Sequence, residues 1–112
     1  MSRRFPGKHH IDSQWALQQL ENEPENTWLG LFKRGPLEIE IYKPHNYDPQ
    51  EPHWADEVYF VISGTGYFKN GDERNPFNPG DVMFVPAGEA HRFEDFSDDF
   101  ATWAIFFAPA NK

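Results

Sequence analysis

The fold of this chain is decided by one stretch, Gly80-Asp81-Val82-Met83-Phe84-Val85-Pro86-Ala87-Gly88-Glu89-Ala90-His91. It opens with a glycine turn, continues through four apolar residues suited to a strand, and reaches a histidine after a Pro-x-Gly turn. A second stretch, Glu51-Pro52-His53-Trp54-Ala55-Asp56-Glu57, leads into an apolar segment that ends at Gly64. These two stretches contain the residues whose chemistry suits a binding site.

Short apolar segments separated by glycine and proline turns surround both stretches. The only helical pattern is Ser13–Leu20, which Asp12 or Ser13 can cap. We therefore predict an all-β sandwich or barrel, with residues 1–12 as an N-terminal arm and residues 13–112 as one domain. The expected strands are residues 28–33, 37–42, 58–63, 67–69, 82–85, 91–96 and 101–107.

Composition excludes several classes of function. The 112 residues contain no Cys, which rules out thiolate zinc sites and cysteine catalysis. The net charge is −8, and residues 44–111 hold 12 acidic but only three basic side chains, so we expect no nucleic-acid partner. No apolar run approaches the roughly 18–20 residues of a membrane helix, and we expect a cytoplasmic protein without membrane contact.

The two stretches resemble the two sequence motifs of the cupin superfamily. The matching residues are His53, Glu57 and Gly64 in the first motif and Gly80, Pro86, Gly88 and His91 in the second. Three positions depart from the motifs. In the first motif, His45 stands in place of the first Gly and Glu51 in place of the first His; in the second motif, Asp95 stands in place of the terminal Asn. The resemblance spans roughly residues 37–107 and implies a double-stranded β-helix, or jelly-roll barrel, of a small single-domain cupin.

The residue types at these positions suit a metal ion. Alternate residues of a strand point to the same face, so Glu51 and His53 can converge. With Glu57 and His91 they offer imidazole and carboxylate ligands for a divalent metal (Fe, Mn, Ni or Zn), and two His with one carboxylate suit non-haem Fe(II). Glu51 is either a second carboxylate ligand, which favours Mn²⁺ or Fe²⁺, or an acid that faces water beside Pro52.

Four further residues are candidates for contacting a ligand: Tyr59, Phe93, Asp95 and Trp103. The first shares a strand face with Glu57, and the next two share one with His91. The alternative for the rings is that they fill the barrel, and for Asp95 that it makes a structural hydrogen bond. Because strand parity turns Arg92 away from His91, no cation is expected to hold an anion, and the predicted ligand is small and neutral or weakly polar.

The resemblance implies a metal-dependent enzyme, of the dioxygenase type with Fe(II) or Mn(II), in which no catalytic residue is assigned. One alternative is a non-catalytic cupin that binds or senses a small ligand. Weaker alternatives are a cupin similar to sugar isomerases or epimerases and a metal-free structural cupin. We also expect a homodimer, with the apolar segment Ala101–Phe107 and the early strand Trp28–Lys33 supplying the interface.

Overall fold

One helix precedes eight strands in the computed structural model, which describes residues 7–49 and 51–108. Residues 1–6 of the predicted arm, and residues 50 and 109–112 of the predicted domain, lie outside the described residues. No helix in the described part is long and apolar enough to cross a membrane. The elements are α1 (Ser13–Glu21), β1 (Trp28–Arg34), β2 (Leu37–Tyr42), β3 (Asp56–Ser63), β4 (Gly66–Asn70), β5 (Glu73–Phe77), β6 (Val82–Val85), β7 (His91–Glu94) and β8 (Ala101–Phe107).

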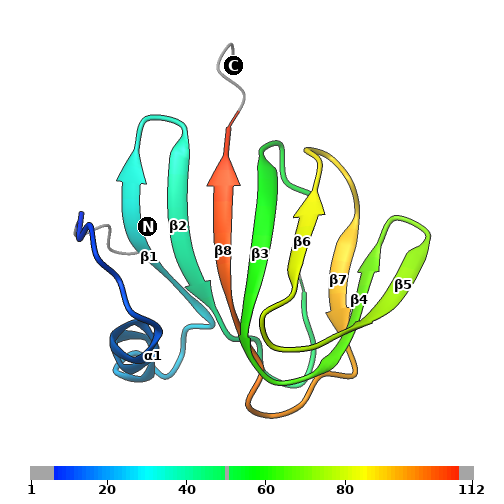
Figure 1. Ribbon diagram of the computed structural model, residues 1–112, viewed down its shortest axis with the longest axis horizontal. Coiled ribbons are helices and arrows are strands. Elements are labelled where there is room, and N and C mark those ends of the chain that lie inside the picture. Colours follow the sequence, from blue (N-terminus) through cyan, green and yellow to red (C-terminus); the bar gives the residue numbers. More distant parts are fainter. Residues whose placement is uncertain (1–6, 50, 109–112) are drawn as a thin grey trace.

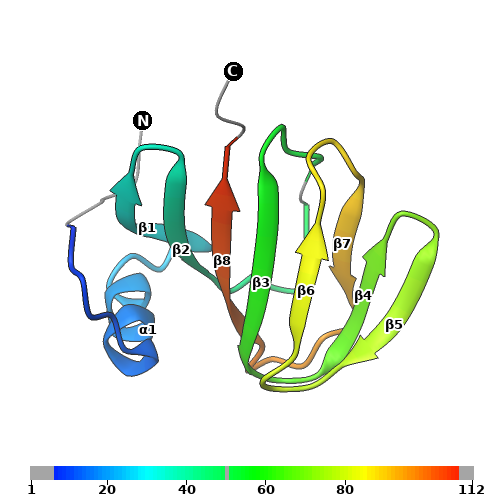
Figure 2. The ribbon, with the colours of Figure 1, turned by 45° about the horizontal axis from the view of Figure 1, so that its top comes forward.

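The strands form two antiparallel sheets (Figures 1 and 2). The larger sheet has the order β1-β2-β8-β3-β6, and the smaller has the order β5-β4-β7. Neighbours in the larger sheet come from distant parts of the sequence, because β8 lies between β2 and β3. This arrangement confirms the predicted mostly-β fold with one N-terminal helix, and it agrees with a jelly roll.

The helix covers the outer face of the larger sheet at its β1–β2 end. Asp12 caps it, since its side chain accepts a hydrogen bond from the backbone N–H of Trp15 at 2.7 Å. Ala16 and Leu20 are buried from the helix side. They pack against a second set of buried residues on the sheet, Leu29, Leu31 and Ile41.

Strand β2 has different neighbours on its two faces. Its odd-numbered residues face the helix side, where Ile41 is fully buried. Its even-numbered residues, Glu38, Glu40 and Tyr42, line a cavity on the opposite face. Both faces of β2 are therefore covered. The apolar face packs beneath the helix, and the face with the two glutamates turns inward and lines the cavity.

Aromatic side chains fill the space between the sheets. The ring of Phe93 lies 4.8 Å from that of Tyr59, 4.8 Å from that of Phe68 and 4.6 Å from that of Phe100, measured between centroids. Phe77 packs against the same group, 5.5 Å from Phe93. Of the two interpretations of the abundant rings, the packed core accounts for this cluster.

Three local expectations need correction. The strand β5 was not expected, because Glu73 to Phe77 contains charges and Pro76, which a sheet tolerates only at an edge, and β5 is an edge strand. Strand β7 ends at Glu94 rather than at residue 96, since Asp95 has a φ of 50° and turns the chain. The segment Ala101–Phe107 supplies no sheet edge, because β8 pairs on both sides; β1 does lie at an edge.

Candidate metal centre

Three potential metal ligands converge at one end of the barrel. His53 precedes β3, Glu57 is on β3, and His91 is the first residue of β7 in the other sheet. One ligand atom from each of the three lies within 4.8 Å of the other two. Oε1 of Glu57 lies 3.3 Å from Nε2 of His91 and 3.7 Å from Nε2 of His53.

The buried polar atoms of this group lack hydrogen bonds. Glu57 is 1% exposed and His91 is 5% exposed. Among the described residues, the two carboxylate oxygens of Glu57 and Nε2 of His91 have no hydrogen-bond partner. Leaving such groups unsatisfied costs about 1–3 kcal/mol each, and more when they are charged. The arrangement is therefore expensive unless a positive charge, carried by a metal ion or by protonated His91, lies among these atoms.

The ring of His91 is held in the orientation that a metal ligand needs. Its Nδ1 lies 3.0 Å from the carbonyl oxygen of Glu89, a geometry in which Nδ1–H donates. That hydrogen bond leaves the lone pair on Nε2, which faces Glu57. Burial lowers the pKa of His91, but the Glu57 carboxylate and the Glu89 carbonyl raise it by more, so the net pKa is raised.

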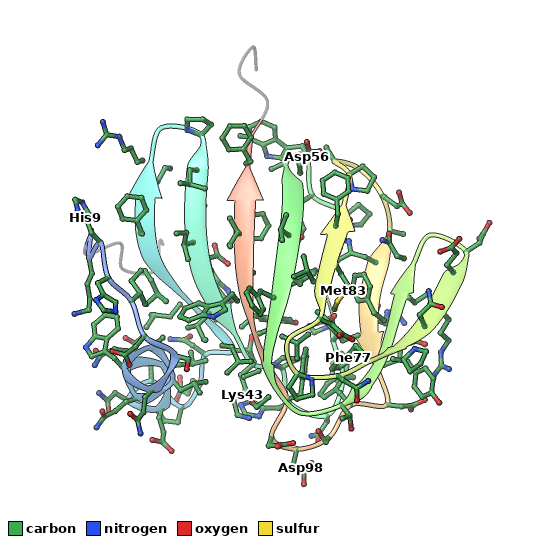
Figure 3. All side chains as sticks on the ribbon, viewed as in Figure 1. His9, Lys43, Asp56, Phe77, Met83 and Asp98 are labelled. Carbon is green, nitrogen blue, oxygen red and sulfur yellow. The ribbon has the colours of Figure 1, made fainter. Side chains whose placement is uncertain are left out.

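Two hydrogen bonds donated by backbone N–H groups hold the segment of His53 against the turn that precedes His91. The N–H of Gly88 donates to the carbonyl oxygen of His53, and the N–H of Ala87 donates to the side chain of Asp56 at 2.9 Å. Gly88 has a φ of +85°, a conformation that favours glycine. The Pro-x-Gly turn thus ties the segment before β3 to the segment before β7. Figure 3 places Asp56 at one end of the sheet, with Lys43 and Asp98 at the other.

A cavity of about 500 Å³ opens beside these ligands, over the inner faces of β2 and β8. Its lining includes His53 and three carboxylates, Glu38, Glu40 and Glu57. It also includes four aromatic side chains, Trp28, Tyr42, Trp54 and Phe106. Apart from His53 and Glu57, these lining residues were not predicted to belong to a site. Three of them, Glu38, Glu40 and Tyr42, form the even-numbered face of residues 37–42, and that alternation is the signal that marks them.

A buried carboxylate, Asp48, supports this cavity and was also not anticipated. It is 2% exposed and accepts hydrogen bonds from the Tyr42 hydroxyl at 2.5 Å and from the backbone N–H of Phe93 at 2.8 Å. Burial, followed by the charge and hydrogen bond of Asp48, strongly raises the pKa of Tyr42, which stays a phenol. Asp48 lies in a proline-rich loop without periodicity, so the sequence carries no signal for its burial.

The structure does not bring every candidate residue to this site. Glu51 is exposed and lies outside the group of three ligands. Asp95 is also exposed, and Arg74 pairs with it at 2.7 Å on the surface. The strand parity that was expected to turn Asp95 inward ends at Glu94, where β7 stops.

The three aromatic candidates lie away from the cavity lining. Tyr59 and Phe93 are buried in the ring cluster, although the Tyr59 ring lies 6.0 Å from that of His91. Trp103 packs with the residues beneath α1, on the opposite face of β8. The inward-facing residues of β8 at the cavity are instead Ala104 and Phe106.

Several known proteins are similar to this chain in sequence. The model of the cupin domain family matches residues 38–107. An uncharacterized protein of Streptomyces coelicolor is 44% identical over 100 residues, which cover 85% of this chain and 95% of that protein. An acireductone dioxygenase of Arabidopsis thaliana is 26% identical over 95 residues, or 79% of this chain, which spans only half of that protein's length.

Solved structures share the fold. The protein TT1209 of Thermus thermophilus superposes with a TM-score of 0.71 at 21% identity, over 90% of this chain and 98% of that one. At that identity the likeness concerns the fold alone. Because this superposition covers 90% of the chain, the shared architecture extends beyond residues 38–107.

Proposed function

This chain belongs to the cupin domain family, and from that premise we propose that it is a metal-dependent enzyme of the dioxygenase type. In this proposal His53, Glu57 and His91 hold one divalent metal ion, and the cavity beside them takes a small organic molecule. The observation that carries the proposal is the set of buried, unsatisfied ligand atoms on Glu57 and His91.

The donor set fits a first-row divalent metal. Two imidazoles and one carboxylate leave coordination positions open, as in non-haem Fe(II) sites. A bound metal supplies a Lewis acid that polarises an oxygen of the ligand. The residues around it have separate tasks: Glu89 holds the ring of His91, Gly88 positions His53, and the burial of Glu57 keeps water from its carboxylate.

The dioxygenase assignment is supported by relatives that carry this name. Acireductone dioxygenases of Leishmania infantum and Arabidopsis thaliana match parts of the chain, at 42% identity over 60 residues and 26% over 95 residues. Because the chain spans 17% and 50% of those two proteins, their activity enters here only as the reaction class to test.

A metal titration tests the ligand assignment. Protein freed of metal is titrated with Fe²⁺ (anaerobically), Mn²⁺, Ni²⁺ and Zn²⁺, and the stoichiometry is measured by calorimetry and elemental analysis. We expect one ion per chain, and a loss of binding in Glu57→Gln and His91→Ala. The matched control is His45→Ala, an exposed histidine outside the group. Absence of binding for all four ions, or unchanged binding in His91→Ala, contradicts the proposal.

Oxygen consumption then separates an enzyme from a binding protein. The Fe²⁺-loaded chain is tested against a panel of small enediols, diketones and phenols, with His91→Ala as the inactive reference. Metal-dependent oxygen uptake in the wild type alone supports the dioxygenase assignment. Ligand binding without uptake favours the alternative of a non-catalytic small-molecule-binding cupin.

We also propose that two copies pair through the outer face of β3 and β6. Phe60 is 46% exposed, Val82 61% and Phe84 55%, and Phe107 on β8 is 56% exposed. Together they expose roughly 400 Å² of apolar surface, about half of the 800 Å² per partner in a standard interface. Half-buried apolar neighbours on β8 and β3 continue this face, and a single face of this kind meets its own copy across a two-fold axis.

Light scattering during gel filtration tests the dimer. The chain has a mass of 13.1 kDa, so the wild type is expected at twice that value and Phe84→Lys at the monomer mass. Tyr47→Lys, which also changes an exposed ring, is the control and stays dimeric. A wild type that elutes with the monomer mass contradicts the pairing.

A further inference from the structure

We infer that the site beside His53, Glu57 and His91 takes a ligand that presents a hydroxyl group, and that the side-chain oxygen of Asn70 accepts its hydrogen bond. Asn70 is the last residue of β4, and it is neither one of the three predicted metal ligands nor part of the cavity lining described above. The inference rests on the proposed function only for the position of the ligand. It narrows the neutral or weakly polar molecule expected from the sequence to one that donates an O–H.

The turn that follows β4 offers a simpler role for Asn70. An Asn-Gly pair is typical of the loop of a two-residue hairpin. Here the loop consists of Gly71 and Asp72, because Asn70 pairs with Glu73 of β5, and Gly71 supplies the positive φ of 62°. Asn70 is therefore a strand residue, and the direction of its side chain has to be explained by its neighbours.

The strand register places Asn70 beside His91. The two residues lie opposite each other in the β4–β7 pair, and the N–H of Gly71 donates to the carbonyl oxygen of Ala90 at 2.9 Å. Since Gly71 and Ala90 form the hydrogen-bonded pair, Asn70 and His91 form the adjacent non-hydrogen-bonded pair. In such a pair the Cα atoms are about 4.5 Å apart and the side chains lie closest together.

Both side chains point into the space between the sheets. Phe68 and Phe93, two residues away on the same strands, are buried opposite each other with their ring centroids 4.8 Å apart. Because alternate residues of a strand share a face, Asn70 lies on the inner face with Phe68, and His91 lies there with Phe93. The rings of Phe68 and His91 are 6.4 Å apart, as this arrangement requires.

One hydrogen bond fixes the orientation of the Asn70 amide. Its Nδ2 donates to the backbone carbonyl oxygen of Phe84 at 3.0 Å. A carbonyl oxygen accepts but does not donate, so turning the amide over would lose this bond. Phe84 precedes Val85, which lies opposite Glu57 in the β3–β6 pair. The amide therefore reaches from the neighbour of His91 in one sheet to the strand beside Glu57 in the other.

This orientation leaves the side-chain oxygen of Asn70 buried without a donor. Among the described residues, the buried side-chain nitrogen and oxygen atoms that have no hydrogen-bond partner belong to Glu57, His91 and Asn70. Two of these residues are predicted metal ligands, and the third is the strand neighbour of His91. Because an unsatisfied buried acceptor is costly, a ligand that supplies a donor to Asn70 gains binding energy there.

A hydroxyl suits this combination of groups. Its O–H donates to the oxygen of Asn70, while its own lone pairs remain for an ion held by the three ligands. A ketone or ether oxygen also has lone pairs but has no proton to donate, so it leaves Asn70 unsatisfied.

A matched pair of neutral probes tests the inference. In 1,2-dimethoxyethane, methyl groups replace the two hydroxyl protons of ethane-1,2-diol. Both probes are titrated into the full chain, first metal-free and then loaded with Zn²⁺, while the tryptophan indole signals are followed by NMR. We expect the diol to bind about three- to tenfold more tightly than the ether in both forms, which is the effect of one neutral hydrogen bond.

Three variants separate the oxygen of Asn70 from the structural role of its amide. Asn70→Leu, of similar size, is expected to abolish the preference for the diol. Asn70→Asp keeps an acceptor but loses the N–H that reaches Phe84, and it is expected to retain the preference; a role confined to the Phe84 bond would affect both variants alike. Asn75→Leu, which replaces an exposed asparagine of β5, is expected to leave the preference unchanged.

The outcomes separate this inference from the proposed function. The inference is overturned if the diol does not bind, if the ether binds as tightly, or if a folded Asn70→Leu keeps the full preference. If the diol is preferred in the metal-free chain while no metal binds at His53, Glu57 and His91, the inference stands and the proposed function falls. If the metal binds but the diol is not preferred, only the inference falls. If Asn70→Leu does not fold, the wild type and Asn70→Asp still decide the question.

Discussion

Replacement of Glu57 by glutamine separates stability from metal binding. Glu57→Gln keeps the size of a side chain that is 1% exposed, and it removes a buried charge whose two oxygens make no hydrogen bond among the described residues. The new amide can donate an N–H to Nε2 of His91, which now lies 3.3 Å from Oε1. In the metal-free protein the variant is therefore expected to be more stable than the wild type.

The magnitude follows from the cost of unsatisfied buried groups. Such a group costs about 1–3 kcal/mol, so we expect the free energy of unfolding to rise by about 1–3 kcal/mol in metal-free Glu57→Gln. For a chain of this size the melting temperature rises by roughly 4–12 °C. Because the pKa of His91 is raised, the measurement is made at about pH 8.5 rather than near neutrality, so that less of His91 is protonated and able to compensate Glu57.

Metal addition shifts the balance of stability toward the wild type. A ligand at one hundred times its dissociation constant stabilises the folded state by about 2.7 kcal/mol, and the wild type should gain this amount from the ion that it binds. Glu57→Gln, with one ligand lost, should gain less than about 1 kcal/mol at the same concentration. The assay is urea unfolding followed by tryptophan fluorescence, with and without metal, and Glu73→Gln serves as the exposed control.

Two results refute this reasoning. If metal-free Glu57→Gln is less stable than the wild type by more than about 1 kcal/mol, the carboxylate is part of a stabilising ion pair rather than an unsatisfied ligand. If metal stabilises the variant and the wild type equally, Glu57 does not hold the ion.

Three further predictions concern the scaffold. Gly64→Ala should lower the free energy of unfolding by at least about 2 kcal/mol, because a Cβ there would lie 2.4 Å from Cα of Phe100 at a φ of +88°; Gly80→Ala, with a φ of +90° but open space, should cost less in the same urea titration. Tyr42→Phe should cost about 1–3 kcal/mol, since Asp48 then loses a buried donor, and an unchanged urea midpoint would contradict that role. Arg74 lowers the pKa of Glu94 below its ordinary value of 4.5, so their ion pair contributes stability above that pH and loses this contribution as the pH falls through the lowered pKa. The difference in melting temperature between wild type and Arg74→Met should therefore shrink below about pH 4.5. A difference that persists there would contradict the ion pair's contribution.

Much of the barrel follows from local sequence patterns. Glycine and proline turns separate the apolar segments, and seven of the eight strands lie where those segments predict them. The exception, β5, carries charges and a proline, since an edge strand can face solvent and leave one side without hydrogen bonds. The pairing of β8 between β2 and β3 was not predicted, because strand order depends on contacts between residues far apart in the chain.

The candidate metal ligands divide in a similar way. His53, Glu57 and His91 were predicted by motif spacing, and the structure brings their ligand atoms within 4.8 Å of one another. Glu51 was placed beside them by strand parity, but that segment precedes β3 and is not a strand, so the parity does not hold there. Parity failed for Asp95 for the same reason, since β7 ends one residue before it.

Residue types and short spacings were enough to predict the family, the β fold with one helix, and a candidate ligand set of nitrogen and oxygen atoms without sulfur. The surroundings of those candidate ligands depended on how the elements pack. That packing turned Glu40 and Tyr42 into the cavity, placed Trp103 beneath the helix, and buried Asp48 against Tyr42. The physical reason is that alternation along a strand fixes which residues share a face, whereas the packing of the helix and the sheets fixes what each face contacts.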